Sequence, residues 1–328
     1  MHVAPNKILI IQTAFIGDAI LSTSMIETWK INYPNSTIDI LVRKGNESLL
    51  NNNPQLNEVL IWDKKKNKYS NLLKLISKVR KANYDAIFNV QRFVATGLIT
   101  ALSRAKIKVG YQSNPLSFLF SRSIPFDTSS DLHETERNAL LLHPYCSGKP
   151  LLPKLYLSEE DELSCEQYNK ESYVCMAPTS VWFTKQWPKE NWVKLIEHLS
   201  SIPIIYLLGA PNDFEACEDI KRLCNSSRVV NLAGRLSFLE SASLMKDAKM
   251  NYVNDSAPMH IASSMNAPTT AIYCSTIPAF GFGPLSENST IIEYKDELAC
   301  RPCGLHGKRE CPEGHFNCAK TINLLIEN

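Results

Sequence analysis

The sequence is not rich in the residues that mark fibrous or low-complexity proteins, since its 328 residues include only 12 glycines and 18 prolines. It also lacks a strong charge of either sign, because 35 Lys and Arg residues stand against 33 Asp and Glu residues. A net charge of +2 excludes a nucleic-acid binder that depends on bulk positive charge, and it argues against an acidic disordered chain. At this length the chain can form about two domains, each with its own core. We therefore expect a globular protein with no nucleic-acid partner.

Long hydrophobic runs are absent as well. A membrane-spanning helix needs about 20 apolar residues, whereas the apolar segment 8–11 is interrupted shortly afterwards by Gln12 and Asp18. The first seven residues lack the basic start, the apolar core and the small-residue cleavage site of a signal peptide. We therefore expect a protein that neither spans a membrane nor is exported.

Cysteine is too sparse for a secreted disulfide scaffold, because ten cysteines are about 3% of the chain, which favours a reducing cytoplasmic compartment. Four of the ten crowd into the tail as Cys300, Cys303, Cys311 and Cys318. One CxxC pair with two further thiols is similar to a zinc ligand set, but the C-x6-C spacing of the second pair departs from that pattern. Structural metal, reduced thiols and a facultative disulfide remain alternatives. No cofactor is expected.

Short apolar runs alternate with helical patterns along most of the chain. In the first half the expected strands are 8–11, 37–42, 59–62 and 84–90, and the expected helices are 19–33 and 69–82. In the second half the expected strands are 173–178, 204–208, 229–232, 250–253 and 269–274, and the expected helices are 189–200, 213–224, 237–246 and 258–265. This alternation indicates two α/β halves with parallel sheets covered by helices, divided near residue 160. Ligands of such sheets bind in a cleft at the carboxyl ends of the strands.

The first candidate site is the turn 12–18, which joins the first strand to the first helix. Gly17 permits a tight turn, and Asp18 follows at the start of the helix. Asp is also a favoured N-cap, so a helix cap and a catalytic carboxylate both remain open from residue type alone. No GxGxxG motif is present, which disfavours a dinucleotide dehydrogenase.

The second candidate site is the turn 177–188 after the first strand of the second half. The hydroxyl groups of Thr179, Ser180 and Thr184 and the ammonium of Lys185 are suited to a phosphate. A solvated loop held down by a packed Trp187 is the alternative.

The third candidate site is the segment 254–260, which opens a short helix after a short strand. Exposed amides at a helix N-terminus favour an anion such as a diphosphate. Asp255 is suited to accept hydrogen bonds from sugar hydroxyls, whereas helix capping by Asp255 or Ser256 is the alternative. His260 is either a core residue or a catalyst.

Together and in this order, these blocks resemble the heptosyltransferase family, glycosyltransferase family 9, of lipopolysaccharide core assembly. The matching segments are 7–11 with 16–19, 185–188, 231–234, 254–262 and the cysteine-rich tail 300–318. The resemblance extends over nearly the whole chain. Two departures are Ala257, where the family commonly has Gly, and Ala177-Pro178, where the family usually has Gly before the hydroxyl-bearing loop.

The resemblance implies an α/β fold of the GT-B class, in which two Rossmann-like domains face a central cleft. Residues 1–160 would bind the acceptor, and residues 161–328 would bind the nucleotide-sugar donor and end in the cysteine-rich tail. The implied reaction is metal-independent, inverting transfer of heptose from ADP-L-glycero-D-manno-heptose to a lipid A–Kdo or heptose acceptor. It would take place at the cytoplasmic face of the inner membrane, in weak peripheral contact with the lipid.

The resemblance also implies roles for individual residues. Asp18 would be the general base, and the acceptor side would include Thr13, Gly17 and, as a looser match, Arg92. The donor side would comprise Thr179, Ser180 and Lys185 at the phosphates, Asp213 (or Glu215 in a shifted register) at the ribose, Leu236 near the adenine, and Asp255, Ser256, Ala257 and His260 around the sugar and diphosphate. Alternative functions are transfer of another sugar from a nucleotide donor, a nucleotide-sugar 2-epimerase, or a non-catalytic nucleotide-sugar-binding protein.

Overall fold

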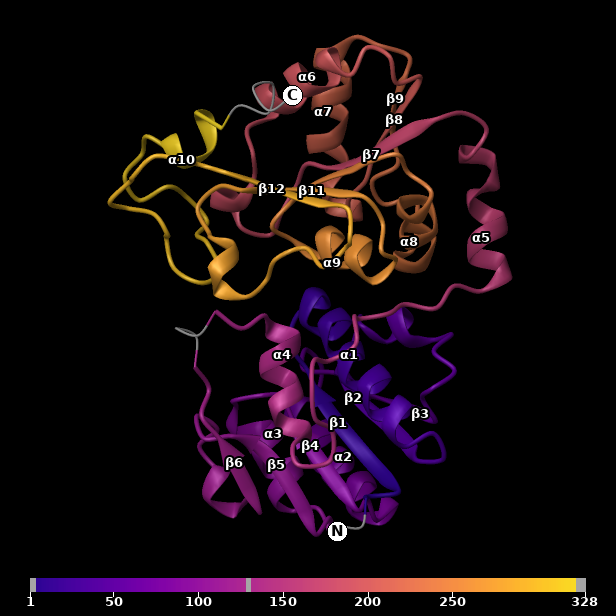
Figure 1. The fold of residues 1–328 in the computed structure, drawn as a ribbon, viewed down its shortest axis with the longest axis vertical. Helices are drawn as coiled ribbons and strands as arrows, with labels where there is room; N and C mark the ends of the chain where they lie inside the picture. The colour runs from indigo at the N-terminus through magenta and orange to yellow at the C-terminus, as the bar shows by residue number, and fades with distance from the viewer. Residues whose placement is uncertain (1–3, 128–130, 323–328) are drawn as a thin grey trace. The chain divides into compact units, whose positions relative to one another are not determined.

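The structure, a computed structural model, describes residues 4–127 and 131–322, and the chain divides into two units, Met1–Tyr156 and Leu157–Asn328 (Figure 1). The strands of unit 1 are β1 (Lys7–Gln12), β2 (Thr37–Arg43), β3 (Glu58–Trp62), β4 (Ala86–Asn89), β5 (Ile107–Tyr111) and β6 (Arg122–Ile124). Its helices are α1 (Ile16–Asn32), α2 (Lys68–Ala82), α3 (Val94–Ala101) and α4 (Glu134–Ala139). The strands form one parallel sheet in the order β3-β2-β1-β4-β5-β6.

Strand β1 is central in this sheet because its residues are apolar toward both faces. Residues 8–11 are completely buried, and Ile8 pairs with Ile38 of β2 on one side and with Ala86 of β4 on the other. One face of the sheet packs against α2, and the other packs against α1, where the buried ring of Trp29 lies 5.3 Å from that of Phe88. Burial on both faces is what fixes a parallel sheet in place.

Unit 2 repeats this plan with a different set of segments. Its strands are β7 (Tyr173–Ala177), β8 (Ile204–Leu207), β9 (Val229–Asn231), β10 (Asn251–Asn254), β11 (Thr269–Tyr273) and β12 (Ser289–Glu293). Its helices are α5 (Glu159–Cys165), α6 (Lys189–His198), α7 (Phe214–Cys224), α8 (Phe238–Lys246), α9 (Ala257–Ser264) and α10 (Asn317–Lys320). The parallel sheet has the order β12-β11-β10-β7-β8-β9, so its first strand again lies beside its fourth.

Each sheet therefore contains a topological switch point. The connection after β1 leads toward β2, whereas the strand on its other side is β4, and the same reversal separates β7 from β10. The loops that leave the two central strands diverge at such a point, so a crevice opens at the carboxyl end of the sheet, where open parallel sheets bind their ligands. All three segments predicted as sites follow one of these strands: 12–18 follows β1, 177–188 follows β7, and 254–260 follows β10.

The prediction of two α/β halves with parallel, Rossmann-like sheets is confirmed, although three strands escaped detection. Strand β5 contains Lys108 and Gly110, β6 has only three residues, and three of the five residues of the edge strand β12 are exposed. None of these strands carries the continuous apolar run that marks a buried strand. Helix α4 was also missed, because its buried residues are mostly polar, as with Glu134 and Arg137.

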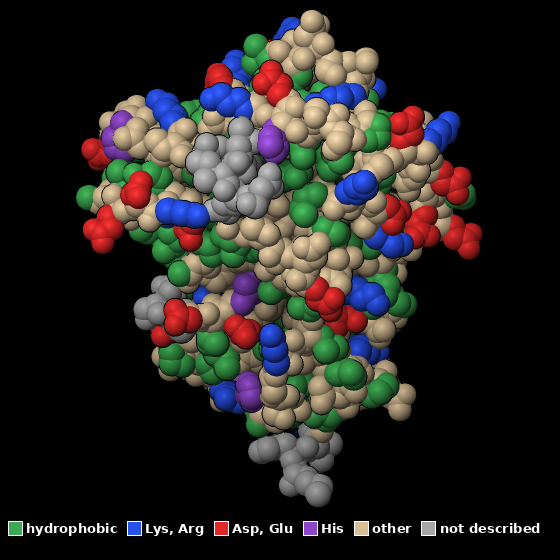
Figure 2. Space-filling model, turned by 45° about the horizontal axis from the view of Figure 1, so that its top comes forward, with side chains coloured by type: hydrophobic (Ala, Val, Ile, Leu, Met, Phe, Trp, Pro, Cys, Tyr) green, Lys and Arg blue, Asp and Glu red, His purple; other side chains and the backbone are tan. Residues whose placement is uncertain are grey.

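The cysteine-rich tail belongs to unit 2. No regular element occurs between β12 and α10, yet Phe316, Cys318 and Ala319 are buried in the same hydrophobic core as Trp192. On the face of the molecule drawn in Figure 2, Lys and Arg side chains are interspersed with Asp and Glu side chains. Over the described ranges, no helix is long and apolar enough to cross a bilayer.

Candidate active site

A pair of glutamines holds the switch point of unit 1 together. The Nε2 group of Gln91, just after β4, donates a hydrogen bond of 2.5 Å to Oε1 of Gln12 at the end of β1. The same oxygen accepts a 3.1 Å bond from the amide of Ala14 in the β1–α1 turn. Both glutamines are buried, so these bonds fix the start of the turn relative to β4.

The structure corrects one interpretation of Asp18. Helix α1 begins at Ile16 and its N-cap is Phe15, so Asp18 is the third residue of the helix and not its cap. Its Oδ2 atom accepts a 3.2 Å hydrogen bond from the amide of Phe15, which satisfies one of the free donors at the helix start. The side chain is partly exposed at the carboxyl end of β1. It is therefore oriented by the helix start and remains accessible to a ligand.

A buried ion pair lies close to Asp18, and no pattern in the sequence had indicated it. Glu134, the first residue of α4, is 6% exposed, and its carboxylate lies 3.0 Å from the guanidinium of Arg137. Burial raises the pKa of the Glu134 carboxyl to about 7, and the negative charge of Asp18 adds to that rise. The positive charges of Arg137 and Arg92 act in the opposite direction. Asp18 thus belongs to a cluster of two carboxylates and two guanidinium groups.

Thr13 and Lys64 form a second set of contacts at the β1–α1 turn. Thr13 is 1% exposed, and the Lys64 ammonium donates to its carbonyl oxygen at 2.7 Å and contacts its hydroxyl at 3.0 Å. The ammonium also lies 4.8 Å from the ring centre of Trp62. Burial lowers the pKa of Lys64 to about 8, and the charges of Arg43 and Lys68 contribute to the same effect. Lys64 is therefore held at the β1–α1 turn and is not a solvated surface charge.

The two remaining acceptor-side residues differ in exposure. Gly17 is the second residue of α1 and is partly exposed. Arg92 is exposed in the loop after β4, and its guanidinium carbon lies 4.0 Å from the ring centre of Phe126. The influence of Arg92 on Glu134 places its charge in the same neighbourhood as Asp18.

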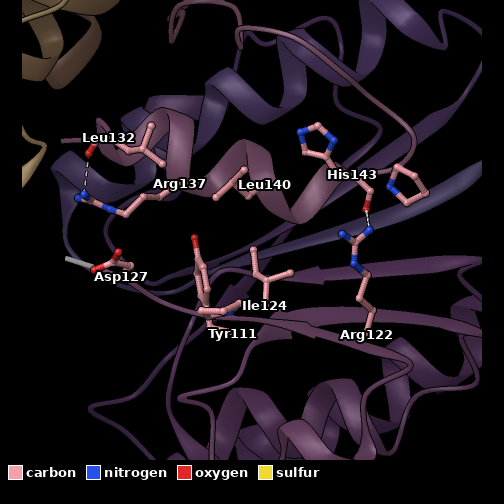
Figure 3. A pocket seen from close by; sticks show the side chains of 10 residues that line it. Tyr111, Arg122, Ile124, Asp127, Leu132, Arg137, Leu140 and His143 are labelled. Carbon is pink, nitrogen blue, oxygen red and sulfur yellow. Dashed lines mark hydrogen bonds between the residues drawn. The ribbon is translucent and has the colours of Figure 1, made fainter. Parts of the chain in front are cut away.

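Unit 1 also contains a pocket of about 610 Å³ between β5, β6 and the segment 132–144 (Figure 3). Arg137 donates a 2.6 Å hydrogen bond to the carbonyl of Leu132, and Arg122 donates to the carbonyl of His143. The guanidinium groups of Arg137 and Arg122 thus both donate to backbone carbonyl groups. No residue that the sequence assigned to the reaction is among those lining the described part of this pocket.

Asn254 fixes the switch point of unit 2. Its Oδ1 atom accepts a 3.1 Å hydrogen bond from the amide of Trp187, and its Nδ2 group donates to the carbonyl of Ala177 at 3.4 Å. Trp187 is 4% exposed and meets the ring of Trp192 edge-on at 5.3 Å. The packing of Trp187 that the alternative interpretation of this loop included is therefore present, and it anchors the loop that carries Lys185.

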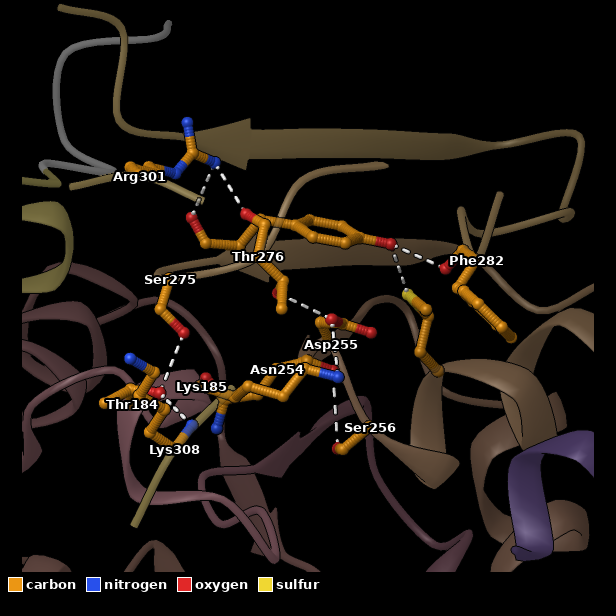
Figure 4. A network of polar contacts seen from close by, with 12 residues as sticks. Thr184, Lys185, Asn254, Asp255, Ser256, Ser275, Thr276, Phe282, Arg301 and Lys308 are labelled. Carbon is orange, nitrogen blue, oxygen red and sulfur yellow. Dashed lines mark hydrogen bonds and ion pairs between the residues drawn. The ribbon is translucent and has the colours of Figure 1, made fainter. Parts of the chain in front are cut away.

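Lys185 and Asp255 form an ion pair of 2.7 Å, with side chains that are 14% and 7% exposed (Figure 4). The hydroxyl of Thr276 donates a second 2.7 Å bond to the same Oδ2 atom of Asp255. These two segments were predicted as separate candidate sites, and the fold brings them into direct contact. Because Asp255 holds the ammonium at the carboxyl end of the sheet, Lys185 is a positioned cation rather than a flexible surface lysine.

The start of helix α9 follows directly after Asp255. Ser256 is the N-cap, but its side chain makes no capping hydrogen bond. The first amides of a helix have no partner within the helix, and together with the helix dipole they favour an anion. Ser256 and Ala257 are partly exposed, whereas His260 is 5% exposed and packs edge-on at 6.4 Å from the ring of Phe282. The core interpretation of His260 is the one that its position supports.

The other predicted donor-side residues lie on loops of the same unit. Thr179 and Ser180 are partly exposed after β7, and the carbonyl of Ser180 accepts a 2.7 Å bond from Gln186. Asp213 follows β8, and its carboxylate accepts a 2.8 Å bond from the amide of Ala210. Leu236 is partly exposed just before α8. Glu215, the alternative to Asp213, is exposed on α7 and lies 3.7 Å from Arg222.

The four tail cysteines are near one another, and all are free thiols. The Sγ atom of Cys300 lies 3.7 Å from Nε2 of His315, and the Sγ atom of Cys303 lies 3.2 Å from the carbonyl of Cys300. Burial raises the pKa of the Cys318 thiol to about 11, and the other three thiols add to the rise. Within residues 4–127 and 131–322, no group of three His, Cys, Asp or Glu side chains is arranged to hold a metal ion.

Comparison with known proteins points to one family. A family model for glycosyltransferase family 9 (heptosyltransferase) matches residues 72–315. Lipopolysaccharide heptosyltransferase 3 of Escherichia coli is 28% identical over 84% of this chain and 85% of its own. Lipopolysaccharide heptosyltransferase 2 of Salmonella typhimurium is 26% identical over 87% of both chains. The solved structure of E. coli ADP-heptose LPS heptosyltransferase II has the same fold, with a TM-score of 0.79 at 23% identity over 89% of this chain and 91% of that one.

Replacing Lys185 should reveal how strongly the fold depends on the ion pair. In Lys185→Met the Asp255 carboxylate stays buried without its counter-charge, so we expect the free energy of unfolding to fall by about 3 kcal/mol. In the double variant Lys185→Met/Asp255→Asn no buried charge remains, and most of that loss should be recovered. Urea denaturation of the two variants and the wild type measures both effects. Equal stability of Lys185→Met and the wild type would show that the pair does not contribute.

Proposed function

Because the chain belongs to glycosyltransferase family 9, the heptosyltransferase family, we propose that it transfers L-glycero-D-manno-heptose from ADP-heptose to the inner core of lipopolysaccharide. The acceptor is a lipid A-linked Kdo or a heptose already attached to it, and transfer inverts the anomeric carbon without a metal ion. One observation carries the proposal. In unit 1 the turn after β1 leads to the accessible carboxylate of Asp18, and in unit 2 a positioned ammonium follows β7 and an uncapped helix start follows β10.

Unit 2 has the chemistry that a sugar diphosphate requires. The Lys185 ammonium and the first amides of α9 supply positive charge for the diphosphate, and Thr179 and Ser180 add hydroxyl donors. Because the Oδ2 atom of Asp255 is already bonded to Lys185 and Thr276, we assign Asp255 the role of orienting the cation as well as bordering the sugar. The small side chain of Ala257 and the alcohol of Ser256 lie at the helix start.

We assign the nucleoside of the donor to the loops after β8 and β9, at the carboxyl edge of the same sheet. Asp213 follows β8, so its carboxylate lies on the loop that a ribose beside the diphosphate would meet. The partly exposed carboxylate of Asp213 suits the ribose hydroxyls, and the apolar side chain of Leu236 suits the adenine face. Donor identity rests on this arrangement and on the ADP-heptose named for the related E. coli enzyme.

Unit 1 has the chemistry that activates a hydroxyl group. We assign Asp18 the role of general base, taking the proton from the acceptor hydroxyl while that oxygen bonds to the anomeric carbon of heptose. The bond between the anomeric carbon and the donor phosphate breaks at the same time, and ADP leaves with the electron pair. Lys185 and the α9 amides stabilise the charge that grows on the diphosphate. We assign Thr13, Gly17, Lys64 and Arg92 to the acceptor side, where the two cations suit an acidic sugar such as Kdo.

Contact with the membrane is proposed to be peripheral and weak. The acceptor is a lipid-anchored saccharide, so the protein works at the cytoplasmic face of the inner membrane. Exposed basic residues next to the acceptor side, such as Lys65 and Lys66, favour an anionic lipid surface. The neighbouring Lys64 is not counted among these lipid-facing residues, because its ammonium donates a hydrogen bond to Thr13 on the acceptor side. Such contact should be lost in a high-salt wash of membrane vesicles.

An acceptor assay tests the function. Purified protein is incubated with ADP-heptose, with and without lipopolysaccharide truncated at Kdo or at the first heptose, and ADP release is measured. A heptosyltransferase releases ADP only when an acceptor is present. Turnover without an acceptor would indicate a 2-epimerase or a hydrolase, and donor binding without turnover would indicate a binding protein. Parallel reactions with other nucleotide sugars decide which sugar is transferred.

Asp18→Asn separates the proposed base from its role at the helix start. The amide oxygen of Asn can accept the same hydrogen bond from Phe15, so the free energy of unfolding should stay within about 0.5 kcal/mol of the wild type. Asn cannot take a proton at neutral pH, so turnover should fall by about 10²–10⁴. ADP affinity should not change. Melting curves, ADP titration and initial rates measure the three quantities.

Asp161→Asn is the matched control for that variant. Asp161 is also the third residue of a helix, and its carboxylate likewise accepts a hydrogen bond from the N-cap amide, here that of Ser158. It carries no proposed role in the reaction. Asp161→Asn should therefore retain near-normal turnover. If Asp18→Asn retains it as well, Asp18 only orders the helix.

Lys64 predicts an alkaline limit for acceptor binding. Because its pKa is lowered to about 8, the ammonium loses its proton and its charge above that pH. The KM for an acidic acceptor should then rise above pH 8 and level off about tenfold higher, which is the effect of losing one charge-assisted contact, with the KM for the donor unchanged. Lys64→Arg should extend the low KM to higher pH, since guanidinium stays protonated. Lys65→Arg, at an exposed neighbour, serves as control; a wild-type KM that is flat between pH 7 and pH 9.5 would remove Lys64 from the acceptor site.

A further inference from the structure

The cysteine-rich tail touches the loop that carries Lys185, and the contact is made by the neighbouring Thr184. The amide of Thr184 donates a 3.1 Å hydrogen bond to the carbonyl of Lys308, and the amide of Lys308 donates a 2.7 Å bond to the hydroxyl of Thr184. The hydroxyl of Ser275 bonds to the same oxygen at 2.9 Å (Figure 4). Thr184 is 1% exposed. Its side chain therefore joins three segments that are distant in sequence.

Gly307 packs directly on Lys185. A Cβ atom at this glycine would lie 3.0 Å from Cγ of Lys185, 3.0 Å from the hydroxyl oxygen of Thr184 and 3.3 Å from Cβ of Trp182. These distances are shorter than ordinary van der Waals contact, so a methyl group here would push the Lys185 stem and its neighbours by a few tenths of an ångström. Gly307 also has a φ of +74°, which a glycine adopts readily.

Arg301 holds the other end of this tail segment. Its guanidinium donates to the carbonyls of Cys274 and Thr276 at 2.8 Å and to that of Tyr294 at 3.1 Å, and it forms a 2.6 Å ion pair with Glu293. The Arg301 side chain is 10% exposed. A buried guanidinium with this many acceptors fixes the backbone around it.

The same tail segment thus supports both members of the ion pair. Cys303 donates its amide to the carbonyl of Ser275 at 2.9 Å, next to Thr276, whose hydroxyl holds Asp255. Gly307 limits the space on the other side, at the stem of Lys185. No helix or strand occurs in this part of the described chain, so its path depends on these contacts. We call residues 300–308 the tail brace.

We infer that the tail brace is a positioning element of the donor site, in which Thr184 and Gly307 hold the Lys185 ammonium where the donor diphosphate binds. The inference rests on the proposed function, which assigns Lys185 to that diphosphate. A lysine side chain has four rotatable bonds, and a cation that is already held in one orientation loses less freedom when the ligand binds. Neither Thr184 nor Gly307 touches the reacting atoms. They act through Lys185.

The test compares Gly307→Ala with Gly314→Ala. Both glycines are in the tail with nearly the same backbone conformation, φ +74° and +69°, so both variants carry the same kind of backbone strain. Only at Gly307 does the new methyl group meet Lys185 and Thr184, because at Gly314 no described residue apart from its chain neighbours lies within 4 Å of a Cβ. The dissociation constant for ADP, measured by calorimetry on the full chain, should rise by about tenfold or more in Gly307→Ala. It should stay near the wild-type value in Gly314→Ala.

A double-variant cycle distinguishes positioning from general damage to the tail. In a Lys185→Met background there is no ammonium to displace, so adding Gly307→Ala should change the ADP dissociation constant by less than about twofold. Thr184→Val provides a second route: it removes the hydroxyl that joins the three segments and should weaken ADP binding, whereas Thr184→Ser keeps the hydroxyl and should restore it. This second pair gives an answer even if Gly307→Ala does not fold.

The outcomes separate the inference from the proposed function. If the wild type binds no ADP, the proposed donor is wrong. If the wild type binds ADP and Gly307→Ala and Thr184→Val bind it equally well, the tail brace has no positioning role and the inference is overturned. If Gly307→Ala weakens ADP binding as much in the Lys185→Met background as in the wild type, the tail acts independently of Lys185, and the inference is again overturned.

Discussion

The proposed base Asp18, the loop that carries Lys185 and the start of α9 all depend on the reversal of strand order at the centre of each sheet. In unit 1 the first strand lies between β2 and β4, and in unit 2 it lies between β8 and β10. Since all the strands are parallel, their carboxyl ends share one edge, and the loops after the central pair lead in opposite directions. The turn that carries Asp18, the loop that carries Lys185 and the helix start at Ser256 all come from these positions. Within unit 2, a change in strand order would separate the Lys185 loop from the helix start at Ser256.

Each switch point has a buried ion pair, but the two pairs have different uses. Glu134 and Arg137 are almost completely buried, and the charge of the partly exposed Asp18 acts on the Glu134 carboxyl. In the other unit the paired lysine is the proposed ligand-binding group, and Asp255 fixes its direction. Burial strengthens both interactions, because few water molecules compete for the charges. It also makes the loss of one partner costly.

The cysteine-rich tail supports the second ion pair, Lys185 with Asp255. Cysteine spacing left a metal site, reduced thiols and a disulfide open, whereas the contacts that join the segment to the ion pair are made by its backbone and by Arg301. Thr184 and Gly307 connect the tail to the loop that carries Lys185. No pattern in the sequence had indicated a contact between these two residues. A glycine whose neighbour lies more than a hundred residues away gives no local signal. Such a contact exists only after the chain has folded.

The sequence by itself determined the class of fold and identified three candidate segments at the carboxyl ends of strands. Continuous apolar runs such as 8–11 identify buried parallel strands, and a polar residue directly after such a strand must lie at the carboxyl edge of the sheet. The tertiary structure decided what those residues do to one another. It placed Asp18 within helix α1 rather than at its cap, turned Lys64 toward Thr13, added Glu134 and Arg137 near the carboxylate, and joined Lys185 to Asp255. These outcomes depend on distances between segments that are far apart along the chain, and periodicity and residue type carry no information about such distances.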